Sequence, residues 1–129
     1  MRPEGLERGL ELFNRGHYWE AHEAWEAAWT PDRHGPDRDL YKGLIQVAAG
    51  CLHYGRANRR GAVNKWRSGA RLLRVYVPSR YGLDLARLVA EVEALLAAME
   101  GQEWPELRMP QIEVAWSERQ GGPPSLDAR

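Results

Sequence analysis

The apolar residues in the first hundred positions recur every three or four residues, which is the period of an amphipathic helix. Segments rich in proline and glycine, at residues 30–36 and 77–82, interrupt this period because neither residue continues a helix interior well. Alternating apolar and polar positions, typical of a strand, are confined to residues 111–115. The pattern therefore predicts an all-α fold. The five expected helices span residues 6–13, 18–29, 36–57, 60–77 and 83–99.

The arrangement of these helices also follows from the pattern. Gly16 separates the first two helices and predicts an N-terminal antiparallel helical hairpin. The third helix is apolar or small almost all round, so we expect it at the centre of a compact bundle of about five helices. Seven residues are expected to be largely buried: Trp25, Trp29, Leu44, Val47, Cys51, Trp66 and Leu73.

The last part of the chain has a different composition. Four prolines after Gly101 argue against another long helix, so we expect residues 1–100 to form the bundle and residues 101–129 a mostly extended tail. Trp104, Met109 and Ile112 are apolar, which predicts that the tail packs across the bundle, while residues 121–129 are expected to be mobile. A homodimer formed through Trp104 and Trp116 is a further hypothesis.

The composition limits the class of protein. The 129 residues are enough for one globular domain with its own core. No segment approaches the ~20 apolar residues of a membrane span, and the acidic start differs from a signal peptide. The single cysteine cannot form an internal disulfide. We therefore expect a cytoplasmic protein that does not enter a membrane.

The densest polar pattern is the HExxE motif, His22-Glu23-x-x-Glu26. On a helical wheel His22 lies within the apolar stripe of the second helix, and Glu26 lies beside it. On the third helix Gln46 and His53 are two turns apart and share one polar strip. If this strip faces the second helix, the four side chains form one buried cluster.

Two interpretations of this cluster remain open. As a site, it is a small-ligand pocket or a divalent-metal centre, because imidazoles and carboxylates are good metal ligands. The metal ligands would then be His22, Glu26 and His53; Glu23 would be the catalytic base of a metal-dependent hydrolase; Gln46 and Asn58 would bind ligand. As a scaffold, the same side chains satisfy one another and fix helix register without catalysis. The scaffold interpretation, in which the protein is not an enzyme, is favoured.

The charges are zero in sum but unevenly placed. Between Leu40 and Arg80 there are nine basic residues and no acidic one. On the fourth helix, four arginines fall on the face opposite the apolar residues: Arg60, Arg67, Arg71 and Arg74. This arginine face is either a surface for nucleic acid or an acidic partner, used by a non-catalytic adaptor, or a solvated face paired with acidic neighbours.

Three segments together resemble a known family. They are FNRGHYWEAHEAWEAAW at residues 13–29, YKGLIQVAA at 41–49 and RANRRGA at 56–62. They are similar to the uncharacterised prokaryotic family catalogued as domain of unknown function 309, over about Leu6 to Leu73. The resemblance implies a compact all-helical domain and no established activity. The family motif corresponds here to Glu20, His22, Glu23, Glu26, Gly43, Gln46, Asn58 and Gly61.

Overall fold

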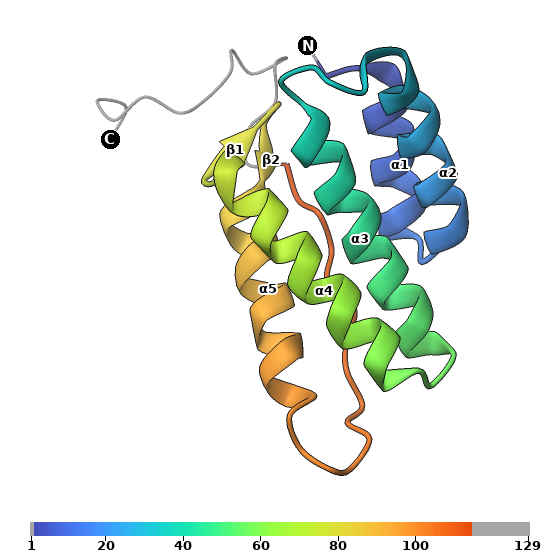
Figure 1. Cartoon of the computed structure of the whole chain (residues 1–129), viewed down its shortest axis with the longest axis vertical. Coiled ribbons are helices and arrows are strands. Elements are labelled where there is room, and N and C mark those ends of the chain that lie inside the picture. The colour runs from blue at the N-terminus through green and yellow to red at the C-terminus, as the bar shows by residue number, and fades with distance from the viewer. Residues whose placement is uncertain (1, 115–129) are drawn as a thin grey trace.

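The computed structural model describes residues 2–114, and within them the fold is all-α, as predicted (Figure 1). The helices are α1 (Glu4–Asn14), α2 (Tyr18–Trp29), α3 (Arg38–Gly55), α4 (Arg59–Leu73) and α5 (Leu85–Ala98). Short 3₁₀ turns follow α2 at Thr30–Asp32 and α4 at Arg74–Tyr76. Two short antiparallel strands, β1 (Ser79–Arg80) and β2 (Leu83–Asp84), precede α5.

The N-terminal hairpin forms because the chain can turn sharply and the two helices can approach closely. Gly16 adopts a φ of +83°, and the amide of His17 donates to the carbonyl of Leu12 at 2.9 Å, which closes α1. At Gly9 a Cβ would lie 2.2 Å from Nε1 of Trp25, so only glycine lets the indole pack there. The predicted antiparallel hairpin of α1 and α2 is confirmed (Figure 1).

Helix α3 lies between α2 and α4, which confirms its central position (Figure 1). Its contact with α4 depends on glycines. A Cβ at Gly50 would meet the Trp66 ring at 2.3 Å, and one at Gly43 would meet the Leu73 side chain at 2.7 Å. The small residues of α3 therefore serve close packing against α4.

The core contains six of the seven residues expected there, and Trp25, Val47 and Trp66 are fully buried. Trp29 is the exception, because it is only partly buried at the end of α2. Its indole Nε1 donates to the carbonyl of Arg33 at 3.2 Å, and the Arg33 guanidinium lies 4.6 Å from its ring centre. The last turn of α2 is thus at the edge of the core.

The segment after α4 was not fully predicted. The helix ends at Leu73 rather than at residue 77, and the chain continues through the 3₁₀ turn into the β1–β2 hairpin. Tyr81 and Gly82 have φ values of +52° and +77°, which is the geometry of a two-residue hairpin turn. The Asp84 carboxylate then accepts from the amide of Arg87 at 3.0 Å and caps the start of α5.

Beyond α5 the chain reverses, and residues 103–114 return along the bundle in extended form (Figure 1). The strand expected at 111–115 is reduced, as far as residue 114, to a single bridge between Leu83 and Val114. The predictions for residues 121–129 and Trp116 lie outside the described residues. Among residues 2–114 no helix combines the length and apolarity needed to cross a membrane.

Candidate functional site

The HExxE motif lies on α2, at the edge rather than in the core. His22 is half-buried, and its imidazole stacks on the Trp19 indole with ring centres 5.2 Å apart and an interplanar angle of 10°. Trp19 is 54% exposed, and Glu23 is exposed as well. The Nδ1 atom of His22 is buried and has no hydrogen-bond partner among the described residues.

Glu26 makes its polar contact within the loop that follows α2. Its carboxylate lies 3.4 Å from Nη2 of Arg33, and both side chains are more than 40% exposed. The same Arg33 nitrogen lies 3.4 Å from the hydroxyl of Thr30, which itself donates to the carbonyl of Glu26 at 2.7 Å. An ion pair this exposed contributes little to stability.

His53 and Asn58 meet at the turn between α3 and α4. The side-chain amide of Asn58 lies 3.1 Å from Nδ1 of His53, and its Oδ1 accepts from the amide of Gly61 at 3.0 Å. Asn58 is therefore the N-cap of α4. A Cβ at Gly61 would lie 2.7 Å from the His53 ring, so the imidazole packs directly on the first turn of α4.

The expected burial of this cluster is corrected by the structure, because none of the polar or charged residues among 2–114 is buried. His22, Glu26, Gln46 and His53 are all partly exposed. The cause is the direction of packing: the small residues beside the polar strip allow close approach to α4 instead of α2. Within the described residues no three His, Cys, Asp or Glu side chains form a group that could hold a metal ion.

The cysteine next to this region is not poised for nucleophilic chemistry. Cys51 is 2% exposed on α3, and burial raises the pKa of its thiol to about 12. Because the thiolate is the nucleophilic form, the side chain is unreactive at neutral pH. Burial likewise raises the pKa of Tyr18, which faces Cys51 from α2.

A second polar cluster, which sequence reasoning missed, joins the start of α3 to the β hairpin. Asp37 accepts from Nε and Nη2 of Arg80, at 3.1 and 2.8 Å, and from the hydroxyl of Tyr81. The hydrogen bond to Asp37 is the main cause of a raised pKa at Tyr81, and burial raises that of Tyr41 to about 12. The sequence signal for Asp37 was only that of a helix start.

The arginine face of α4 lies on the solvent side, as the sequence predicted. All four guanidinium-bearing residues are exposed: Arg60, Arg67, Arg71 and Arg74. Arg74 pairs with Glu93 of α5. The guanidinium groups of Arg60, Arg67 and Arg71 make no hydrogen bond or ion pair with any residue between 2 and 114. Three cationic groups on this face are thus unpaired within the described structure.

The comparison with known families addresses residues 6–64, which comprise most of α1, all of α2 and α3, and the first turns of α4. These residues match the model of DUF309, a domain of unknown function. The resemblance to DUF309 is confirmed. No curated protein matches the chain. DUF309 is described as a domain of unknown function, so the match assigns no activity to these residues.

Proposed function

We propose that this protein binds the phosphate backbone of nucleic acid through the arginine face of α4, as a module without catalytic activity. The observation that supports this most strongly is the state of Arg60, Arg67 and Arg71. All three are exposed, share one helix face and lack an acidic partner in the part of the chain described. A solvated structural face would be expected to pair with its acidic neighbours, and among residues 2–114 only Arg74 of this face does so.

The chemistry of the face fits phosphate. Arginine presents several N–H donors in a planar fork that matches the geometry of phosphate oxygens, whereas lysine presents a compact point charge. From Arg60 to Arg74 the face extends about 20 Å along the helix at 1.5 Å per residue. Helix α4 carries no acidic residue that would oppose the approach of a polyanion, and the acidic residue of α3, Asp39, lies in its first turn.

The metal-site interpretation has less support. Two of its three expected ligands already have other partners: Glu26 contacts Arg33, and His53 contacts Asn58. Each lies near the C-terminal end of its helix, and because α2 and α3 run antiparallel, these ends lie at opposite ends of the bundle (Figure 1). A shared metal would require both contacts to break and the side chains to converge. The buried Nδ1 of His22, which has no hydrogen-bond partner among residues 2–114, favours a ligand beside this imidazole. Among the described residues no second ligating side chain accompanies it to form a metal-binding group.

The test is binding of fluorescent double-stranded DNA and single-stranded RNA by anisotropy, over a series of salt concentrations. Neutralising a phosphate releases counterions, so each contact makes the slope of log affinity against log salt concentration more negative by about 0.9 for duplex DNA. The triple variant Arg60→Gln, Arg67→Gln, Arg71→Gln should lose most of the binding, and any residual binding should show a slope smaller by about 2 to 3.

The matched control removes three positive charges elsewhere. Arg8, Arg15 and Arg87 are exposed on α1, at its end and on α5, so the triple Gln variant at these positions has the same net charge. It should retain binding. Equal loss in both triple variants would show that net charge alone controls binding. Absence of any complex at low salt would refute the proposal.

A further inference from the structure

The extended segment after α5 is held mainly through its own backbone, by side chains of the bundle. Asn14, at the end of α1, forms a paired contact with Ile112: its Nδ2 donates to the carbonyl at 2.9 Å, and its Oδ1 accepts from the amide at 2.8 Å. This is how an asparagine side chain imitates a neighbouring strand. The contact depends on the peptide group of residue 112 and not on its side chain.

Two further side chains act in the same way. The Tyr54 hydroxyl of α3 donates to the carbonyl of Pro105 at 2.7 Å and accepts from the amide of Leu107 at 2.8 Å. The Arg59 guanidinium of α4 donates to the carbonyl of Glu103 at 2.7 Å. Three side chains from three helices therefore hold the backbone of one extended segment along its length.

Apolar side chains of the segment provide the anchors. Ile112 is only 2% exposed and belongs to the core, while Leu107 and Met109 pack against it. Trp104 stacks on Tyr54 with ring centres 5.0 Å apart. Backbone contacts with side-chain anchors at intervals are the general mode by which a groove binds an extended peptide.

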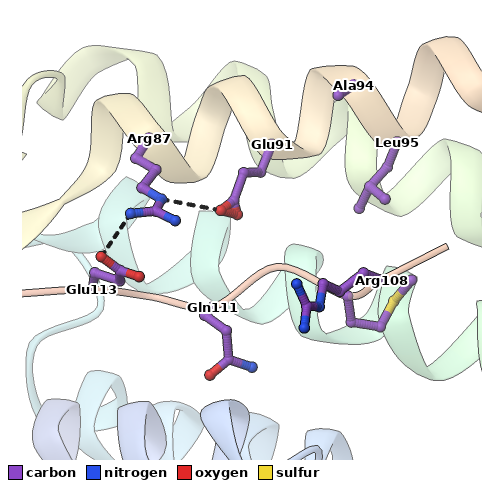
Figure 2. Close-up of a pocket in the computed structure, with 8 residues that line it drawn as sticks. Arg87, Glu91, Ala94, Leu95, Arg108, Gln111 and Glu113 are labelled. Carbon is purple, nitrogen blue, oxygen red and sulfur yellow. Dashed lines mark hydrogen bonds and ion pairs between the residues drawn. The ribbon is translucent and has the colours of Figure 1, made fainter.

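The groove is wider than the segment that occupies it. Between α5 and residues 108–113 lies an open pocket of about 590 Å³, lined by Leu95 and Met109 together with charged side chains (Figure 2). Across its end, Arg87 pairs with Glu91 at 3.3 Å and with Glu113 at 2.7 Å. The Arg87–Glu113 pair joins the segment to α5, and an ion pair this exposed contributes little to holding the segment in place.

The DUF309 match includes the three side chains that hold the segment but not the segment itself. Asn14, Tyr54 and Arg59 all lie within residues 6–64, whereas residues 103–114 lie outside the match. The hinge between bundle and segment, at Glu100–Gln102, is exposed, and an added Cβ at Gly101 would meet no atom within 4 Å. Within this exposed link the carbonyl of Gln102 accepts from Nη2 of Arg59 at 3.4 Å, so displacement of the segment requires this contact to break as well.

We infer that this groove is a binding site for extended peptides, and that the partner it fits is residues 103–114 of a second copy of the chain. The structure shows that this sequence satisfies the three backbone contacts and fills the Ile112 position. Exchange between two copies would preserve every one of these contacts. The intramolecular segment then acts as a competitor that keeps the single chain closed.

The first experiment measures binding of a fluorescent peptide with the sequence of residues 103–114 to full-length chains. In Ile112→Asp, the buried carboxylate weakens the intramolecular segment and leaves the groove intact. This variant should bind the peptide at least 10-fold more tightly than the wild type. A peptide that itself carries Ile112→Asp should not bind.

The contribution of the groove is tested in the same background. Adding Asn14→Ala should weaken peptide binding by about 10-fold or more, because two hydrogen bonds are lost. Adding Asn64→Ala, an exposed asparagine of α4, should have no effect. No peptide binding by an Ile112→Asp chain with native circular dichroism, or equal effects of the two asparagine variants, would overturn the inference.

A second measurement does not depend on the Ile112 variant folding. In the wild-type chain, excess peptide should accelerate hydrogen exchange at the amides of Leu107 and Ile112, as the intramolecular segment is displaced; unchanged exchange overturns the groove. Light scattering on wild-type chain refolded at millimolar concentration should then show a dimer, and excess peptide of residues 103–114 added during refolding should reduce it by occupying the groove. Peptide binding without a dimer would contradict a second copy as the partner and would indicate an extended segment of another protein.

Discussion

The contact between α3 and α4 allows a sharp prediction, because one glycine lies against one tryptophan. In Gly50→Ala the new Cβ would lie 2.3 Å from Cδ1 and 2.5 Å from Nε1 of Trp66. Trp66 is fully buried, so its ring cannot rotate away into solvent. Overpacking of this kind costs about 1 to 3 kcal/mol, while alanine in place of glycine returns about 1 kcal/mol of helix propensity. We therefore expect a net loss of up to about 2 kcal/mol in the free energy of unfolding.

The control is in the same helix. A Cβ at Gly55, the last residue of α3, would meet nothing within 4 Å, so Gly55→Ala should be neutral or stabilising by up to about 1 kcal/mol. Urea unfolding followed by circular dichroism measures both. Combining Gly50→Ala with Trp66→Leu should reduce the cost of the alanine, with a coupling of about 0.5 to 3 kcal/mol. Equal stability of Gly50→Ala and Gly55→Ala would refute the reasoning.

Three further predictions concern single groups. Burial raises the thiol pKa of Cys51 from 9.0 to about 12, so the folded chain keeps a proton that the unfolded chain loses above pH 9. The contribution of Cys51 to the free energy of unfolding should therefore fall by about 1.4 kcal/mol from pH 8 to pH 10. Urea unfolding of Cys51→Ala at the same pH values should not show this fall. Asn58→Ala removes the N-cap of α4 and should cost about 1 kcal/mol by thermal or urea unfolding, whereas Asn58→Asp should keep most of the stability. Tyr54→Phe leaves the carbonyl of Pro105 and the amide of Leu107 without their partner, so hydrogen exchange at Leu107 should accelerate at least 10-fold while that of the α3 amides stays unchanged.

The fold could be predicted to a large extent because its determinants are local. Gly16 ends one helix, and the apolar period resumes in phase on the next, so the hairpin and its inward face both follow from the sequence. The end of α4 was placed four residues too late, because Val75 and Val77 continue the apolar count although both are exposed. The β hairpin depends on Tyr81 adopting a positive φ, which is uncommon for tyrosine and leaves no pattern in the sequence.

The candidate site was less predictable because it depends on which neighbour each face of α3 meets. The helical wheel correctly grouped Gln46 and His53 with small residues, but it could not tell whether α2 or α4 would approach them. It is α4 that packs there, because Gly50 leaves room for Trp66 and Gly43 leaves room for Leu73. The exposure of the arginine face, by contrast, followed from the sequence, because it required only that the apolar residues of α4 point inward.

The position at which the DUF309 match ends has a consequence for handling the protein. Residue 64 falls inside α4, two residues before Trp66 and nine before Leu73. A fragment cut at this boundary would leave α3 with two glycine-lined hollows open to water and α4 with less than half of its length. The limits of the match are therefore limits of sequence similarity and not of a folding unit. Any shortened version intended for crystallisation or labelling has to retain α4 in full.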